Sequence, residues 1–186
     1  MFIQTEPTPN PATLKFIPGQ GVMPAGTADF TNVEAAQKSP LAKRIFAVDG
    51  TSAVFFGPDF VTVTKDDTME WEHLKPGILS AIMEHYQSGQ PVIEGDAASG
   101  GHADHDGEDG EIVGQIKELL DTRVRPAVAQ DGGDITFHGF DKGVVYLHMQ
   151  GACAGCPSST ITLKMGIENL LRHYIPEVTE VRPVGV

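Results

Sequence analysis

The sequence predicts an α+β protein made of two small α+β domains. Short runs that alternate like strands are interspersed with segments of helical spacing. Hydrophobic residues make up 40% of the 186 residues, which is enough for packed cores. Residues 94–111 carry seven acidic and no basic side chains, and no apolar side chain there is larger than alanine. We therefore expect domains over 1–93 and 112–186, joined by a flexible acidic linker over 94–111.

In the first domain we expect an antiparallel sheet with two helices. Prolines within residues 7–11 forbid a helix and favour a rigid turn between two extended runs. Ser39 followed by Pro40 is typical of a helix N-cap and first turn, and residues 57–59 favour a hairpin turn. The expected elements are strands over 2–6, 13–17 and 28–32, a helix over 39–48, strands over 52–56 and 60–65, and a helix over 75–86 that ends near Gly89.

The second domain is predicted to have the order α-β-β-α-β. Apolar residues at helical spacing begin at Ile112. Pro126 should kink or restart this first helix before Asp131-Gly132-Gly133 ends it. Strands over 134–140 and 144–149 follow about a turn at 141–143, and then a helix over 157–173 and a last strand over 177–184. The glycine pair is not a phosphate loop, because no Lys-Ser/Thr follows it.

Composition and charge exclude several classes of protein. The formal net charge of −12 argues against a nucleic-acid partner, since a duplex binder needs a positive face. No run of about 18 apolar residues predicts a membrane span, and residues 1–6 do not resemble a secretory signal. The 2 cysteines cannot form a disulfide scaffold in a chain of this length.

Both cysteines lie in one short motif, Cys153-Ala154-Gly155-Cys156. This spacing lets two sulfurs approach one metal centre, and the surrounding glycine and alanine residues leave little side-chain bulk. Cys156 directly precedes a helix, whose positive end should stabilise thiolates or an anionic cluster. A C-x-x-C pair by itself is compatible with a redox dithiol, a zinc ligand pair or an iron–sulfur ligand pair.

The number of ligands favours a site shared between two chains. A tetrahedral zinc ion or a [4Fe–4S] cube needs four protein donors, and one chain supplies two thiolates. Two chains that meet at this loop would supply all four. Because opening such a dimer removes half of the ligands, the arrangement favours a carrier over a permanent electron-transfer centre.

Several segments carry a resemblance to a known family. The segments DGGDITFHGF, GVVYLHMQGACAGCPSSTITLKMGIENLL and HYIPEVTEV resemble the NifU C-terminal (Nfu) domain. The segments FIQTEPTPNPATLKFIPG and KSPLAKRIF, with Trp71-Glu72, resemble the Nfu N-terminal domain. The resemblance implies a non-enzymatic iron–sulfur cluster scaffold or carrier, in which Cys153 and Cys156 bind a [4Fe–4S] cluster shared across a homodimer. Met165 stands where a polar residue, often Asn, is expected.

The resemblance also implies partners and a compartment. The partners are an upstream cluster donor and recipient apo iron–sulfur proteins. We expect a bacterial cytoplasm, because no Arg-rich presequence precedes the Nfu-like segment, with the mitochondrial matrix as the alternative. A [2Fe–2S] rhomb is the alternative cluster, since it also uses four thiolates. The competing functions are a thiol–disulfide oxidoreductase that uses the same pair and a structural zinc clasp.

Four histidines and one tryptophan are weaker candidates. His138 and His148 precede the cysteine loop and could ligate iron, although strand histidines more often pack or face solvent. His102 and His105 lie in the acidic segment, which offers no preorganised geometry for a cation. Trp71 could contact a partner, but we expect it in the core of the first domain.

Overall fold

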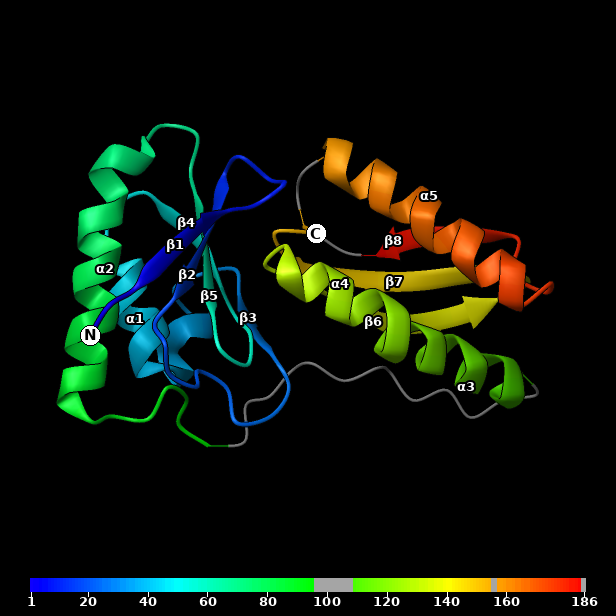
Figure 1. Cartoon of the computed structure of the whole chain (residues 1–186), viewed down its shortest axis with the longest axis horizontal. Coiled ribbons are helices and arrows are strands. Elements are labelled where there is room, and N and C mark those ends of the chain that lie inside the picture. Colours follow the sequence, from blue (N-terminus) through cyan, green and yellow to red (C-terminus); the bar gives the residue numbers. More distant parts are fainter. Residues whose placement is uncertain (96–108, 155–156, 185–186) are drawn as a thin grey trace. The chain divides into compact units, whose positions relative to one another are not determined.

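The structure is a computed structural model that describes residues 1–95, 109–154 and 157–184, with the backbone alone at 157–160. The chain divides into two compact units, Met1–Ser99 and Gly100–Val186, as two sheets with their own helices (Figure 1). The boundary falls inside the segment expected to be a linker. The limits of that linker stay a prediction, because residues 96–108 lie outside the described ones.

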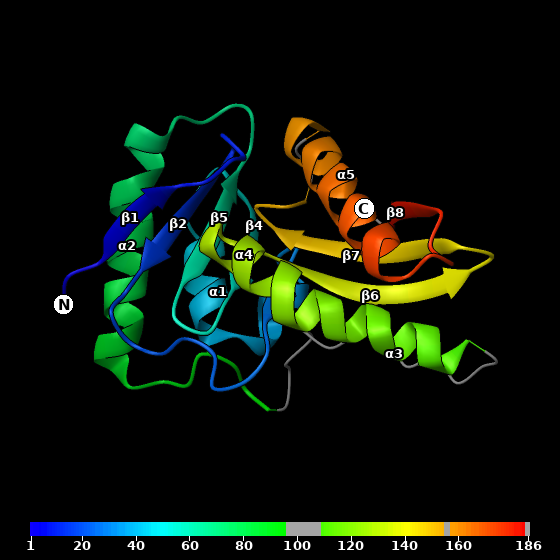
Figure 2. The ribbon, with the colours of Figure 1, turned by 45° about the vertical axis from the view of Figure 1, so that its right-hand side comes forward.

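The N-terminal unit contains a five-stranded antiparallel sheet of order β1-β2-β5-β4-β3. Two helices and a short 3-10 helix pack against one of its faces (Figure 2). The elements are β1 (Gln4–Pro7), β2 (Thr13–Ile17), β3 (Ala28–Phe30), η1 (Ala35–Lys38), α1 (Pro40–Phe46), β4 (Thr51–Phe56), β5 (Val61–Lys65) and α2 (Trp71–Ser88). The expected antiparallel α+β unit is therefore confirmed, and η1 is an addition.

Apolar side chains at alternating positions of the strands form the core of this unit. Phe16, Phe56 and Val61 are buried on the sheet face that the helices cover. Ser39 caps α1 as expected, because its Oγ accepts a hydrogen bond from the backbone N–H of Ala42 at 3.0 Å. One cluster of buried apolar side chains thus holds both helices against the sheet.

Helix α2 begins at Trp71, earlier than the sequence predicts. The expectation placed Pro76 in the first turn, whereas Pro76 lies inside the helix and is exposed. The carbonyl that lacks a donor belongs to Glu72, which is also exposed, so water can satisfy it. Trp71 packs against the core, as expected, and its Nε1 donates to the carbonyl of Pro11 at 3.1 Å.

His85 on α2 is fully buried, and its ring nitrogens have no hydrogen-bond partner among the described residues. Burial lowers the pKa of His85, and the positive charge of Arg44 lowers it further. The folded unit therefore favours neutral His85, while the unfolded chain takes up a proton near pH 6.5.

We predict that the N-terminal unit loses stability as the pH falls below about 6.5, because the unfolded state then binds the extra proton. A His85→Leu variant should lose less over the same range. Thermal unfolding from pH 7.5 to 5, followed by fluorescence, measures this unit alone because Trp71 is the only tryptophan. Equal losses of melting temperature in both proteins would contradict the prediction.

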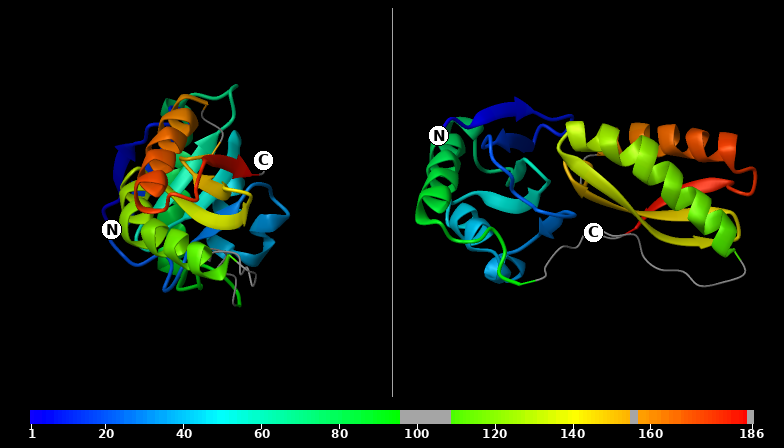
Figure 3. Two further views of the ribbon diagram at one scale, coloured as in Figure 1. Left: turned by 90° about the vertical axis from the view of Figure 1, so that its right-hand side faces the viewer. Right: turned by 60° about the horizontal axis from the view of Figure 1, so that its bottom comes forward.

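The C-terminal unit has the predicted order α-β-β-α-β. Its sheet has the order β6-β7-β8, with β6 and β7 antiparallel and β7 and β8 parallel. The helices lie side by side over one face of this sheet (Figure 3). The elements are α3 (Gly110–Leu119), η2 (Leu120–Val124), α4 (Arg125–Gln130), β6 (Gly133–Asp141), β7 (Val144–Gly151), α5 (Pro157–Tyr174) and β8 (Glu180–Val184).

The first helix of this unit is interrupted by the turn η2 and restarts as α4 with Pro126 in its first turn, as predicted. The turn η2 is a π-helix, in which the backbone N–H of Arg125 donates to the carbonyl of Leu120. This wider turn precedes Pro126, which has no N–H to donate. The β6–β7 turn has positive φ angles of 49° at Lys142 and 83° at Gly143, as the favoured two-residue hairpins require. Across the described residues, no helix is long and apolar enough to cross a membrane.

Candidate functional site

The end of the β6–β7 hairpin positions the cysteine loop. Gly133 at the start of β6 pairs with Gly151 at the end of β7. Gly151 has a φ of 63°, which favours glycine and lets the chain turn back there. The backbone N–H of Ala152 then donates to the carbonyl of Gly132 at 3.1 Å, and that of Ala154 donates to Gly151 at 3.1 Å. The loop is therefore folded over the first residues of β6.

Cys153 lies against Gly133 in this arrangement. Its side chain is only 5% exposed and belongs to the apolar core of the unit. A Cβ atom at position 133 would lie 2.5 Å from the Sγ of Cys153 and 2.9 Å from the carbonyl oxygen of Gln150. Only glycine therefore leaves room for the sulfur. The sequence predicts that Gly133 helps to end a helix, but it does not predict this contact with Cys153. The signal was a glycine on the strand that pairs with the motif.

The electrostatic environment of Cys153 differs from the expectation for a helix start. Burial raises the pKa of the Cys153 thiol to about 12, and the carboxylates of Asp131 and Asp134 add to this rise. Cys153 is therefore a neutral thiol near pH 7 when no metal is bound. The expected stabilisation of a thiolate does not hold for Cys153, and Cys156 lies outside the described residues.

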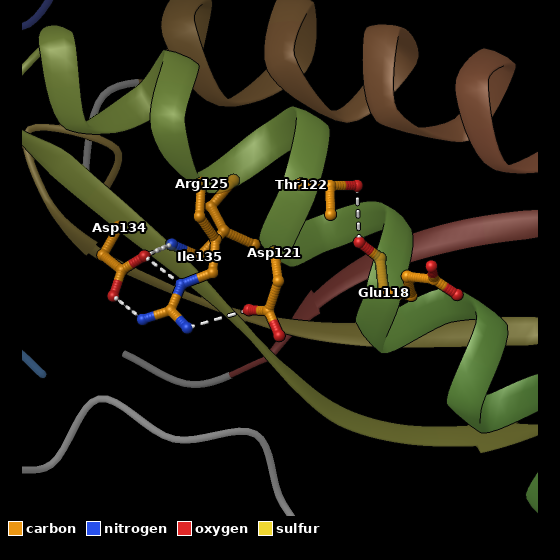
Figure 4. Close-up of polar contacts among 6 residues, drawn as sticks. All are labelled: Glu118, Asp121, Thr122, Arg125, Asp134 and Ile135. Atoms are coloured by element: carbon orange, nitrogen blue, oxygen red, sulfur yellow. Dashed lines mark hydrogen bonds and ion pairs between the residues drawn. The ribbon is translucent and has the colours of Figure 1, made fainter.

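A partly buried ion pair supports β6 beside the cysteine loop (Figure 4). The guanidinium of Arg125 donates from Nε and Nη2 to the two carboxylate oxygens of Asp134, each at 2.8 Å. It also donates from Nη1 to Asp121 at 3.0 Å, one turn earlier. These hydrogen bonds raise the pKa of Arg125, and those to Asp134 make the largest contribution. Asp134 also accepts from the backbone N–H of Ile135 at 2.8 Å.

The Arg125–Asp134 pair links helix α4 to the start of strand β6, next to Gly133. A bidentate pair of this kind holds both groups in one geometry. It therefore fixes the strand on which the sulfur of Cys153 packs. The spacing of Arg125 and Asp134 in the sequence, nine residues across a helix end, offers no simple pattern for predicting the pair.

The histidine candidates are dispersed in the structure. His138 is exposed at the irregularity between Phe137 and Gly139, and His148 is half-buried opposite Thr136. The described residues, which leave out Cys156, contain no group of three or more His, Cys, Asp or Glu side chains that could hold a metal. His102 and His105 lie outside the described residues.

In comparisons with known proteins, both units match the models of known domain families. The N-terminal unit matches the family model "Scaffold protein Nfu/NifU N terminal" over residues 3–89, and the C-terminal unit matches "NifU-like domain" over residues 116–182. The human protein named "NFU1 iron-sulfur cluster scaffold homolog, mitochondrial" is 52% identical over 185 residues, which cover 99% of this chain and 72% of that protein. The chain belongs to the Nfu family. The resemblance seen in the sequence is thereby confirmed.

Two further similarities accompany this Nfu-family assignment. "NifU-like protein 4, mitochondrial" of Arabidopsis thaliana is 57% identical over 181 residues, 96% of this chain and 64% of that protein. This Nfu-family chain thus spans less than two thirds of the plant relative. The solution structure of a NifU-like protein from Saccharomyces cerevisiae covers 52% of this chain and 87% of that one, at 29% identity and a TM-score of 0.47.

Proposed function

We propose that this Nfu-family chain is a non-enzymatic iron–sulfur cluster carrier. Its cargo is a [4Fe–4S] cluster held by Cys153 and Cys156 of two chains. The observation that carries the proposal is the C-x-x-C pair at the end of the β6–β7 hairpin, where Gly133 leaves room for the sulfur of Cys153. Thiolates are the protein ligands that iron–sulfur clusters use. The names of the human and plant relatives support the scaffold or carrier role.

Transfer in this proposal is an exchange of ligands. Cluster binding removes the proton of the Cys153 thiol and forms an iron–sulfur bond, so each loading step releases protons. During delivery, a thiolate of the recipient replaces a thiolate of the carrier on iron, and no electron changes hands. Because each chain supplies only half of the ligands, separating the two chains frees the cargo. The partners are an upstream cluster donor and apo iron–sulfur proteins.

Burial of Cys153 argues against the alternative of a thiol–disulfide oxidoreductase that uses the same pair. An attacking cysteine needs access to its substrate and a populated thiolate. Cys153 is buried in the core of the unit.

The compartment that we infer is one that contains apo iron–sulfur proteins. The names of the relatives support a mitochondrial location, whereas the bacterial cytoplasm was the first expectation from the sequence.

Anaerobic reconstitution tests the proposal. Wild-type protein should take up about four iron and four sulfide per two chains. Cys153→Ala and Cys156→Ala should each lose most of this iron, because each removes two of the four thiolates of the shared site. His138→Ala is the matched control, since His138 is exposed and the proposed ligand set consists of cysteines alone. Mössbauer spectra distinguish a cube from a [2Fe–2S] rhomb.

Four results would contradict the carrier proposal. The first is a folded wild-type protein that takes up no iron. The second is a Cys153→Ala variant that keeps its full complement. The third is catalytic reduction of insulin disulfides at the rate of a thioredoxin control, which would favour the oxidoreductase. Zinc without sulfide in anaerobically purified protein would instead favour the structural clasp.

A further inference from the structure

Helix α5 exposes two large apolar side chains near its start. Ile161 is 58% exposed and Met165 is 60% exposed. They are four residues apart, so they lie one turn apart on the same face of the helix. A different face of α5 contains Ile167 and Leu171, which are buried in the core of the unit. The folding of this unit therefore does not account for the apolar character of Ile161 and Met165.

This apolar surface lies close to the cysteine loop. Helix α5 begins at Pro157, directly after Cys156 in the chain. At a rise of 1.5 Å per residue, Ile161 lies about 6 Å and Met165 about 12 Å along the helix from that start. Anything large that approaches the cysteine loop along this side of α5 would therefore also cover the two side chains.

We propose that a second copy of this chain covers Ile161 and Met165 when the cluster is bound. The inference rests on the carrier function proposed above, in which the ligand set is incomplete without a second cysteine loop. In a two-fold dimer the same surface occurs on both partners. The twofold axis passes through the shared cluster, so the starts of the two α5 helices approach each other. Ile161 and Met165 of one chain then pack against the same residues of its partner.

Charge does not oppose this self-association. Residues 112–186 contain seven basic and eight acidic side chains, a net charge of −1. Two basic residues of α5 have ion-pair partners in their own chain. The Nζ of Lys164 lies 3.9 Å from the Oε1 of Glu180, and the Nη1 of Arg172 lies 3.8 Å from the Oε1 of Glu168. Both pairs are partly exposed, so they can remain in place when two apolar surfaces meet.

The small area of the surface indicates a dimer that depends on the cluster. A stable interface buries about 800 Å² on each partner, and two exposed side chains supply only part of this area. The apolar contact and the four iron–thiolate ligands must therefore act together. The chains associate when the cluster is loaded and separate when it leaves, which suits a carrier.

The test compares wild type with an Ile161→Gln/Met165→Gln variant after anaerobic reconstitution. Sedimentation gives the dimer fraction, and chemical analysis gives iron and sulfide per chain. Each side chain occurs twice in a two-fold interface, so the double variant should dimerise at least about tenfold more weakly and lose its cluster on dilution. Val33→Gln is the matched control, because Val33 is 56% exposed in the other unit. Far-ultraviolet circular dichroism confirms that all three proteins fold.

The outcomes separate this inference from the carrier function. A double variant that dimerises and holds its cluster like wild type overturns the surface assignment and leaves the carrier function intact. A double variant that dimerises normally but delivers its cluster more slowly assigns the surface to recipients, which also overturns the inference. If wild type takes up no cluster and stays monomeric, both proposals fail. If wild type takes up no cluster but dimerises through Ile161 and Met165, the carrier function fails, and so does the inference that this dimer depends on the cluster.

Discussion

Replacing Arg125 by methionine should destabilise the C-terminal unit by about 3–5 kcal/mol. The side chain of Asp134 is 5% exposed, and Arg125 is its bidentate partner. The substitution leaves this carboxylate buried without the cation, whereas methionine preserves much of the aliphatic packing of the arginine. Domains are stable by about 5–15 kcal/mol, so this loss is a large fraction of the total.

Urea unfolding of the full chain measures this loss. Far-ultraviolet circular dichroism should show the transition of the C-terminal unit at lower urea. Trp71 fluorescence should show the transition of the N-terminal unit unchanged, because Trp71 belongs to that unit. Arg123→Met is the matched control, since Arg123 is exposed and stacks 5.3 Å from the ring centroid of Tyr174. Its loss should be about 1 kcal/mol or less.

A double variant, Arg125→Met with Asp134→Leu, distinguishes the cost of the unpaired carboxylate from the loss of its hydrogen bonds. If the cost comes from the unpaired carboxylate, the double variant should be more stable than Arg125→Met alone. A double variant that is less stable than Arg125→Met would show that the hydrogen bonds of Asp134 to β6 matter more than its charge.

Replacing Gly133 by alanine should disrupt the cysteine loop and sharply reduce iron uptake while the unit stays folded. The new Cβ would lie 2.5 Å from the Sγ of Cys153 and 3.0 Å from its backbone nitrogen. Both contacts are too short, so the loop must move. Overpacking of this kind costs about 1–3 kcal/mol, which most domains tolerate. We expect faster reaction of Cys153 with a thiol reagent, because the displaced sulfur becomes more exposed.

Gly139→Ala is the matched control for Gly133→Ala. Gly139 lies on the same strand, and a Cβ there would meet no atom within 4 Å. The control should keep iron uptake and the slow reaction of Cys153. If Gly133→Ala takes up iron like the control, then the contact between Gly133 and Cys153 is not required for the proposed site.

Most of the fold could be predicted because local signals and tertiary packing agree. The start of β2 follows from the prolines before it, and the start of α1 follows from Ser39 and Pro40. The start of α2 was missed because Pro76 is typical of a first turn, whereas exposure lets it lie within the helix. The π-helical turn before Pro126 was missed because its spacing differs from that of an α-helix by one residue.

Only the proposed ligands of the candidate site can be identified from the sequence. The C-x-x-C motif is visible there, and the number of thiolates leads to the proposed two-chain site. The packing of Cys153 on Gly133 joins residues that are distant in sequence through strand pairing, which no local pattern shows. The raised pKa of Cys153 depends on the same burial. The glycine pair and Asp134 were therefore visible as residues, but their relation to the sulfur was not.

Burial of Cys153 has a consequence for the lifetime of the empty protein. Peroxides oxidise thiolates that solvent can reach, and the first product can proceed to irreversible acids. Cys153 is protonated near neutral pH and is 5% exposed, so it presents little of the susceptible form. In the carrier that we propose, Cys153 would therefore resist oxidation in the interval between delivery of one cluster and loading of the next.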